Sequence, residues 1–290
     1  MVDLEKKLRS PFKIGNKVYP NPIWLASGTC GFGEDITDFI NLKKLGGIVV
    51  KGTTLKPREG NPTPRVVETP AGMLNSIGIQ NPGVWGVIKE KIPFLKKYKV
   101  PIIVNISGIC TADSCSAMSD FEELAKIIAD NVEVDGIEIN VSCPNVTGKN
   151  LANNMLWLEK VVAVVKKNSK APVITKLSPN TADITGMAKA VENGGTDAIS
   201  LINALLGMKI DVKTQQPVLG NKMGGLSGPA IRPVAIRMVY QVRQVTKLPI
   251  IGIGGIICKE DIFEFFCAGA DAVQLGTMNF VDMNQINSFF

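Results

Sequence analysis

The chain has 290 residues, 45% of them hydrophobic and 6% aromatic, and a formal net charge of +6. Because the lysines are dispersed and aromatic residues are few, we expect anionic small molecules as ligands and no nucleic-acid partner. The charged N-terminus and the absence of an apolar run of about 18 residues predict neither a signal peptide nor a membrane span.

Eight short apolar segments, spread along the whole chain, have the pattern of buried strands. Continuous apolar runs without in-and-out alternation are typical of parallel strands covered on both faces. The predicted strands are 23–26, 48–50, 101–104, 135–140, 172–175, 198–201, 248–251 and 272–275. Segments with helical spacing lie between them, at 35–45, 84–98, 119–131, 155–168, 181–193, 231–245 and 259–268. This alternation predicts an α/β fold, a (β/α)₈ TIM barrel, with a doubly wound open sheet as the alternative.

Two long polar segments interrupt this alternation. Residues 56–82 are rich in proline, and the alternation at 65–69 predicts a small hairpin. Residues 205–228 are a second excursion, rich in glycine and lysine. Neither has the composition of a linker, so we predict one domain over residues 1–290, with inserted loops and hairpins at the C-terminal face of the barrel. Pro93 is expected to interrupt its helix, and Ser119 with Glu122 predicts a capping box.

The chain contains six cysteines and no histidine. No cysteine pair has C-x-x-C spacing, so we expect no metal site and no iron–sulfur cluster in this chain, and a reducing cytoplasm as its location. Proton transfer near neutral pH then has to use cysteine, lysine, a carboxylate of raised pKa or bound water. Cys143 is the best-placed candidate, because it follows a strand ending at Asn140 and Pro144 stops that strand. The alternative is that Cys143 is a small buried apolar residue.

Nearly every predicted strand ends in a polar residue or a glycine. The C-terminal strand ends form the functional face of such barrels, although each residue alone is also compatible with an ordinary turn. The last two strand ends are glycine-rich and precede helical patterns, which predicts a phosphate site, although tight turns also require glycine. Together they indicate a phosphorylated cofactor across the barrel mouth. The residues are Ser27, Lys51, Asn105, Asn140, Cys143, Lys176, Asn203, Gly254, Gly255, Gly276 and Thr277.

Six motifs, in order along the chain, resemble those of the dihydroorotate dehydrogenases. The resemblance covers roughly residues 12–282. The versions at 175–180 and 224–229 are most similar to class 1B, whose catalytic subunit uses NAD⁺ through an electron-transfer subunit; the fumarate-using class 1A is less similar. The motifs are Lys51-Gly-Thr-Thr54, Asn75-Ser-Ile-Gly-Ile-Gln-Asn-Pro-Gly83, Asn140-Val-Ser-Cys-Pro-Asn145, Thr175-Lys-Leu-Ser-Pro-Asn180, Gly224-Gly-Leu-Ser-Gly-Pro-Ala230 and Ile251-Gly-Ile-Gly-Gly255.

The resemblance implies an FMN enzyme that oxidises (S)-dihydroorotate to orotate in pyrimidine biosynthesis. It makes Cys143 the base that removes the C5 proton, while the hydride from C6 passes to flavin N5. Lys51 would lie beside both flavin and substrate and stabilise the reduced ring. The implied substrate-binding residues are Lys51, Asn75, Ser76, Ile77, Gly78, Ile79, Asn140, Asn203 and Ala204.

The resemblance also implies the cofactor site and the partners. One FMN is expected per chain, with FAD and a [2Fe–2S] cluster only in a partner subunit that binds a homodimeric core to form a heterotetramer. Residues 145–154, with Gly148 as a hinge, would form a lid over the site. The implied FMN-binding residues are Ser27, Lys51, Gly52, Asn105, Asn140, Lys176, Ile202, Gly228, Gly254, Gly255, Gly276 and Thr277.

Three features depart from the family pattern. Ala204 stands where the family usually has threonine or serine, so a hydroxyl contact to substrate is lost. The loop 108–119, with Cys110 and Cys115, is longer than usual, and the tail after Phe280 is short, so the eighth helix is expected to be truncated or replaced by a partner's surface. Two other functions stay open: a related flavin barrel acting on another dihydropyrimidine, and a non-catalytic flavin-binding subunit.

Overall fold

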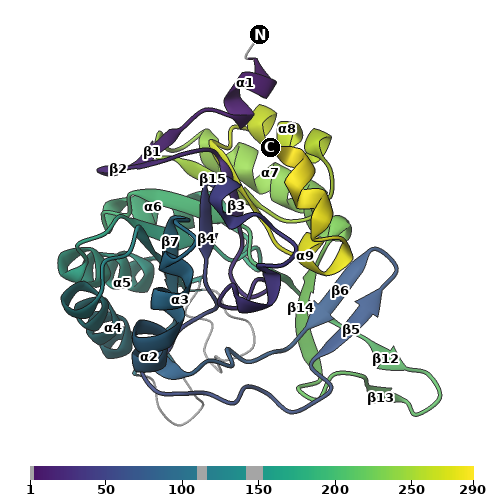
Figure 1. Cartoon of the computed structure of the whole chain (residues 1–290). Helices are drawn as coiled ribbons and strands as arrows, with labels where there is room; N and C mark the ends of the chain where they lie inside the picture. The colour runs from purple at the N-terminus through teal and green to yellow at the C-terminus, as the bar shows by residue number, and fades with distance from the viewer. Residues whose placement is uncertain (1–2, 110–115, 142–152) are drawn as a thin grey trace.

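Eight parallel strands close into a barrel in the computed structural model, which describes residues 3–109, 116–141 and 153–290 (Figure 1). Each strand pairs with the next along the chain, and the last pairs with the first. The predicted (β/α)₈ barrel is therefore confirmed, and the open sheet is wrong. The strands are β3 (Ile23–Leu25), β4 (Gly47–Val49), β7 (Ile102–Ile106), β8 (Gly136–Asn140), β9 (Val173–Lys176), β10 (Ala198–Leu201), β15 (Ile250–Ile253) and β16 (Ala272–Leu275).

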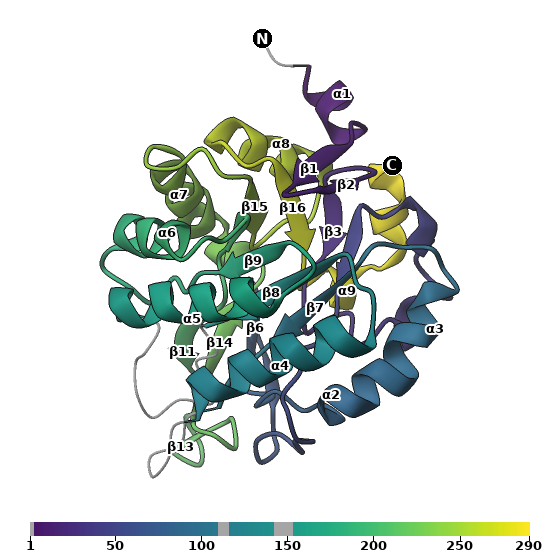
Figure 2. The same cartoon turned by 90° about the vertical axis from the view of Figure 1, so that its left-hand side faces the viewer.

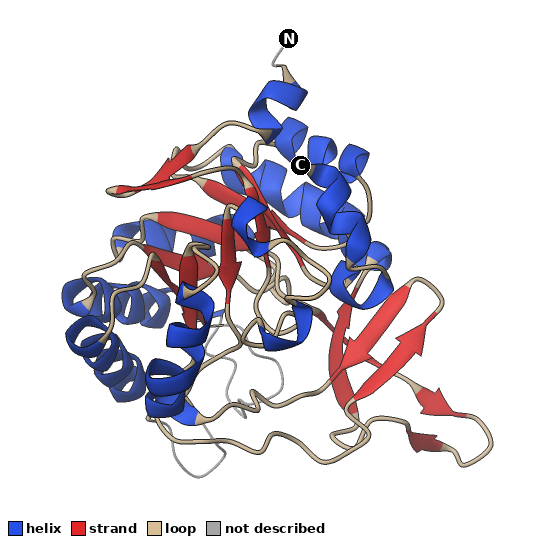
Figure 3. Ribbon diagram, viewed as in Figure 1, coloured by secondary structure: helices blue, strands red, loops and turns tan. Residues whose placement is uncertain are grey.

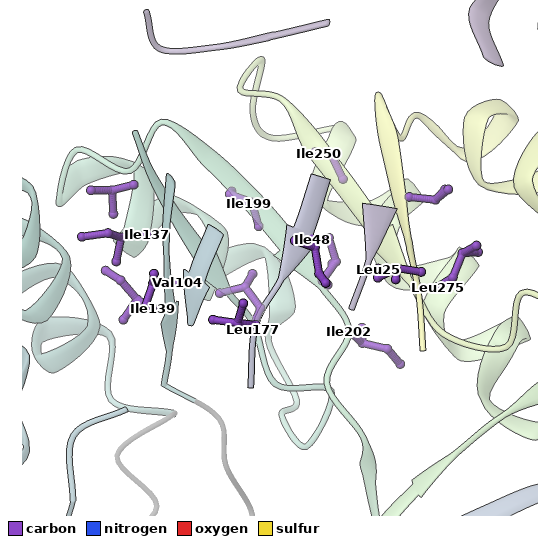
Figure 4. Packing of buried hydrophobic residues seen from close by; sticks show 14 of the residues in the cluster. Leu25, Ile48, Val104, Ile137, Ile139, Leu177, Ile199, Ile202, Ile250 and Leu275 are labelled. Atoms are coloured by element: carbon purple, nitrogen blue, oxygen red, sulfur yellow. The ribbon is translucent and has the colours of Figure 1, made fainter. Parts of the chain in front are cut away.

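Amphipathic helices surround the barrel (Figures 2 and 3). Helix α5 buries Leu158, Val161, Val162 and Val165, a spacing that places the four side chains on one face. They pack with the outward-facing side chains of the strands in one continuous core, part of which is shown in Figure 4. No helix in the described ranges is long and apolar enough to span a membrane. The helices are α4 (Ala117–Asn131), α5 (Met155–Asn168), α6 (Ile184–Asn193), α7 (Arg232–Arg243) and α8 (Lys259–Ala268).

Three of the predicted helices differ in detail. Residues 35–45 form two 3₁₀ turns, η1 (Glu34–Ile36) and η2 (Leu42–Lys44), because Asn41 is extended and its side chain accepts a hydrogen bond from the Lys43 N–H. Helix α4 begins at Ala117, so Ser119 is not its cap; the Ser119 hydroxyl donates to the Ser116 carbonyl.

The segment around Pro93 remains helical. It consists of α2 (Gly83–Gly86), the π-helical η3 (Val87–Lys91) and α3 (Ile92–Lys96). Pro93 falls in the first turn of α3, and the π turn before it changes the hydrogen-bonding pattern where the proline has no N–H to donate. The expected interruption is therefore a change of helix type and not a break.

An N-terminal hairpin packs on the start of the barrel strands. It is preceded by α1 (Leu4–Leu8) and consists of β1 (Phe12–Ile14) and β2 (Lys17–Tyr19). The rings of Phe12, Tyr19 and Trp24 lie 4.6–5.5 Å apart, and the Tyr19 hydroxyl donates to the Asp135 carbonyl at 2.6 Å. Tyr19 and Trp24 also join a second core cluster inside the barrel, with residues from six of the other barrel strands. This end is filled with apolar side chains, which leaves the opposite end for a site.

The two insertions meet in one antiparallel sheet. Residues 66–75 form the predicted hairpin, β5 (Val66–Thr69) and β6 (Gly72–Asn75). The second excursion supplies β11 (Leu205–Met208) and β14 (Met223–Ser227), and the sheet order is β11-β14-β6-β5. A small outer hairpin, β12 (Ile210–Asp211) with β13 (Gln216–Pro217), extends from it (Figure 1). The sheet borders the C-terminal ends of the barrel strands.

The C-terminal tail is short and packs on the barrel. Helix α9 (Met278–Val281) has only four residues, and the 3₁₀ segment η6 (Asn284–Phe289) follows. Ile286 and Phe289 are buried, and Asn287 bonds the backbone of Phe39 and Asn41. After β16, the described chain therefore continues only as these two short segments.

Candidate active site

Two adjoining cavities lie at the C-terminal ends of the barrel strands. The larger has a volume of about 380 Å³ and the smaller about 110 Å³, and Ser27, Lys176 and Asn203 line both. A separate cavity of about 510 Å³ lies between the C-terminal ends of α4 and α5 and the β1–β2 turn, but it contains none of the predicted site residues. Its volume alone does not make it a site, whereas the predicted polar residues converge on the other two cavities.

Most of the predicted residues line this pair of cavities. Ser76 and Asn105 do not line either cavity, and both are buried. The Ser76 hydroxyl accepts a hydrogen bond from Asn61 Nδ2 at 2.9 Å. The predicted residues that line the larger cavity are Ser27, Lys51, Gly52, Asn75, Ile77, Gly78, Ile79, Asn140, Lys176, Asn203 and Ala204. Those found only in the smaller are Ile202, Gly228, Gly254, Gly255, Gly276 and Thr277.

Two lysines face the cavity from strands β4 and β9, which β7 and β8 separate in the barrel. Lys51 follows β4, and burial lowers its pKa, an effect that nearby Arg65 increases and Asp35 opposes. Lys176 is the last residue of β9; it is only 5% exposed and its Nζ lies 3.5 Å from Ser27 Oγ. Ammonium groups held in a partly dry cavity attract an anionic or electron-rich ligand more strongly than they would in water.

Three asparagine side chains come together from different elements. Asn203 Nδ2 lies 3.4 Å from Asn140 Oδ1, and Asn203 Oδ1 accepts from the Ala204 N–H at 2.8 Å. Asn75 enters from the inserted hairpin, where its Nδ2 donates to the Gly225 carbonyl at 3.3 Å. Side-chain amides that both donate and accept suit a ligand whose ring carries N–H and C=O groups.

The backbone at Gly78 and Ile79 makes a tight turn beside these amides. Gly78 has φ +77° and Ile79 has φ +55°, and a Cβ added at Gly78 would lie 2.6 Å from Asn61. Only glycine fits there without displacing Asn61. The carbonyls of Ile77, Gly78 and Ile79 accept hydrogen bonds from Asn61, Arg58 and Asn81, respectively. The sequence indicates this turn only through its motif.

Two of the glycines that bound the smaller cavity have no room for a side chain. Gly228 and Gly255 have φ values of +96° and +75°, and an added Cβ would lie 2.7 Å from Gly72 Cα and 2.6 Å from Arg232 Cβ, respectively. At the start of α8, the Ile257 and Cys258 N–H groups both donate to Asp261 Oδ2. The phosphate site expected at the glycine-rich strand ends stays a prediction, in which the glycine turns before α8 would contact the anion.

A buried amide beneath the larger cavity has an unpaired oxygen. Asn105 Nδ2 donates to Glu138 Oε1 at 2.7 Å, whereas Asn105 Oδ1 is buried and has no partner among the described residues. A Cβ added at Gly52, which lines the cavity, would lie 3.2 Å from that oxygen. Since buried oxygens of this kind usually accept a hydrogen bond, the site fits a ligand that carries a donor.

Several lining residues were not predicted. Thr29 accepts a hydrogen bond from Asn279, and Ser227 accepts one from Thr277. Both could have been found, because Thr29 closes the first strand end and Ser227 lies within a family motif. Met73 and Phe280 also line the larger cavity, and no local signal in the sequence indicates them.

Some predicted features lie outside the described residues. These are Cys143, with Cys110 and Cys115 of the long loop, and residues 145–152 of the predicted lid. Within the described ranges the free cysteines are Cys30, Cys258 and Cys267. No group of three Cys, Asp or Glu side chains in those ranges is placed to hold a metal ion.

Comparisons with known proteins agree with this architecture. The family model for dihydroorotate dehydrogenase matches residues 11–288. The chain is 51% identical, over 90% of its length and 82% of the relative's, to "Dihydroorotate dehydrogenase B (NAD(+)), catalytic subunit" of Geobacillus sp. (strain WCH70). A protein of the same name from Desulforamulus reducens is 50% identical over 95% of this chain and 89% of its own length. Another from Geotalea daltonii is 49% identical over 90% of this chain and 84% of its own length. The chain belongs to the dihydroorotate dehydrogenase family.

Proposed function

We propose that this chain is the catalytic subunit of an NAD⁺-linked dihydroorotate dehydrogenase, which oxidises (S)-dihydroorotate to orotate in pyrimidine biosynthesis. The observation that carries this proposal is the cavity at the barrel mouth, where two lysines and three asparagines converge. The names of relatives about 50% identical support the same reaction and acceptor. A fold of this kind hosts many reactions, so the argument depends on the site and the family and not on the barrel.

FMN is the cofactor that fits the described residues. The glycine turns at Gly228 and Gly254–Gly255 leave room for a phosphate, and Gly276 and Thr277 complete that end of the cavity. The unpaired oxygen of Asn105 suits a ring N–H or a ribityl hydroxyl. When bound, FMN would supply the hydride acceptor; the chain's own residues bind it and keep it facing the larger cavity.

The larger cavity would hold the substrate. Asn75, Asn140 and Asn203 present amides that match the N–H and C=O edges of a dihydropyrimidine, and the turn at Ile77–Ile79 supplies backbone N–H groups for its carboxylate. Lys51 would stabilise negative charge that develops between substrate and cofactor. Cys143 would remove the C5 proton; this assignment rests on the sequence motif.

The proposal includes a second subunit. The relatives' name describes a catalytic subunit, which implies a separate partner. We propose that a homodimeric core of this chain binds two copies of a subunit with FAD and a [2Fe–2S] cluster, which carries electrons to NAD⁺. Co-expression tests this arrangement directly. Purified complex should oxidise dihydroorotate with NAD⁺, and the chain alone should not. Efficient turnover by the chain with fumarate would contradict the NAD⁺ assignment, and bleaching by dihydrouracil but not dihydroorotate would contradict the substrate.

A serine at position 204 should restore a substrate contact. Ala204 lines both cavities beside Asn203, and its own N–H and carbonyl are occupied by Asn203 and Asn180. A Cβ added at Gly225 would lie 2.5 Å from the Ala204 methyl, so space there suits serine better than the larger threonine. One added hydrogen bond should lower the KM for dihydroorotate and the Kd for orotate roughly two- to tenfold.

The control for this variant is A204G, which removes the methyl and adds no hydroxyl. Steady-state KM and orotate titration of the bound flavin spectrum measure both variants. An A204S enzyme whose KM rises, or equals that of A204G, would show that no substrate group faces this position.

A further inference from the structure

A carboxylate is buried inside the barrel below the proposed cofactor. Glu138 lies on β8, two residues before Asn140, and is 0% exposed. Asp261, the other buried carboxylate in the described ranges, pairs with Arg232. The described hydrogen-bond partners of Glu138, in contrast, are all neutral side chains. Burying a carboxylate without a positively charged partner costs folding free energy, so the presence of Glu138 calls for an explanation.

Three donors from three other strands converge on Glu138. Asn105 Nδ2 of β7 donates to Oε1 at 2.7 Å. Ser200 Oγ of β10 and Gln274 Nε2 of β16 donate to Oε2 at 2.9 and 3.0 Å. All three donor residues are 0% exposed. The carboxylate is thus the centre of a network that crosses the barrel interior.

This network decides which way the amides face. Asn105 and Gln274 both turn their NH₂ groups toward Glu138, whose carboxylate oxygens accept from them. Their oxygens then point elsewhere, and neither has a partner within the described residues. The Asn105 oxygen lies against Gly52, which lines the larger cavity. If residue 138 donated a hydrogen bond to Asn105, the Asn105 oxygen would accept it and would no longer face Gly52.

We propose that Glu138 is a positioning residue, which holds Asn105 with its oxygen toward the cavity as an acceptor for an N–H or O–H group of FMN. The inference rests on the proposed cofactor. It assigns Glu138 no contact with the flavin; its effect passes through the Asn105 amide. The ordinary alternative is that the carboxylate only stabilises the barrel, and the two roles differ in what restores binding.

The test reverses the polarity of the Glu138–Asn105 hydrogen bond. In E138Q the new amide can donate toward residue 105, which makes Asn105 turn and present its NH₂ to the cavity. In E138Q/N105D the introduced carboxylate accepts a hydrogen bond from the introduced amide and again presents an oxygen to the cavity, and the total charge equals that of the wild type. S200A is the matched control, since it removes another donor to Glu138 without touching Asn105.

FMN is titrated into the apo forms of all four proteins and followed by flavin fluorescence, with urea unfolding of each apo protein measured alongside. A mispaired buried group should weaken FMN binding about ten- to hundredfold in E138Q. The double variant should recover to within about threefold of wild type, and S200A should stay within the same range even if it unfolds more easily. The absorption spectrum of bound flavin should shift in E138Q and return in the double variant.

Each other outcome overturns the positioning role. If the affinity for FMN changes in parallel with the urea stability of the apo proteins, Glu138 is purely structural. The same holds if the double variant binds FMN no more tightly than E138Q. Equal binding by E138Q and wild type contradicts the proposal directly. If E138Q and the double variant are both insoluble, the carboxylate is a folding requirement and the proposal also fails. Absence of FMN binding by the wild type would instead refute the proposed cofactor, so the two failures are distinguishable.

Discussion

Replacing Cys143 with serine should slow the reduction of bound flavin by dihydroorotate about 10²- to 10⁴-fold, while FMN stays bound. A cysteine thiol has a pKa near 8.5 and is partly ionised at neutral pH, whereas a serine hydroxyl is a far weaker acid and supplies almost no anionic base. Stopped-flow bleaching of the flavin under anaerobic conditions measures this half-reaction without any partner subunit.

Two other cysteines help to interpret this variant, one as a control substitution and one as a thiol that stays protonated. Cys267 is exposed on α8, away from both cavities, so C267S should reduce flavin at the wild-type rate. Cys30 is buried, its sulfur lies 3.3 Å from the carbonyl oxygens of Ala26 and Val49, and burial raises the pKa of its thiol to about 12. A thiol of that pKa stays protonated at neutral pH, so Cys30 is not expected to act as a base. Unchanged reduction in C143S would remove Cys143 from the mechanism.

Replacing Lys51 with methionine should lower the rate of flavin reduction about 10²- to 10³-fold, because it removes one preorganised charge from a partly dry site. Methionine keeps much of the side-chain volume, so the cavity wall is preserved. Reduction by dihydroorotate is again followed at 1:1 flavin loading. K43M, which removes an exposed lysine of η2, is the charge-matched control and should reduce flavin normally.

The pH profile gives Lys51 a second signature. Burial lowers the pKa of Lys51 from the ordinary lysine value of 10.5. As the pH rises, Lys51 therefore loses its positive charge at a lower pH than an ordinary lysine does. The rate of flavin reduction should therefore fall on the alkaline side below pH 10.5. In K51R the guanidinium stays charged, and this alkaline fall should move to higher pH. A K51M enzyme that keeps the wild-type rate and alkaline fall would rule out the electrostatic role.

The eight strands and their polar ends were predictable from the sequence alone. Buried parallel strands are short continuous apolar runs, and the residue after each run is placed at the barrel mouth by the strand itself. Lys51, Asn140 and Lys176 were located in this way, with strand boundaries within two residues of those observed. Two of the helix predictions were less accurate, since Asn41 and Ser119 act through local hydrogen bonds that a periodic pattern does not show.

Only the tertiary structure decided how the two insertions complete the site. Asn75 pairs with Gly225, 150 residues later, and nothing local in either segment encodes that pairing. The same holds for Glu138, which in sequence is a single charge within an apolar strand. Its hydrogen bonds with Asn105, Ser200 and Gln274, which come from three other strands, become visible only in the folded barrel. Strand position follows from short-range periodicity, but partners distant in sequence meet only when the barrel closes, because closure and not local propensity brings those strands together.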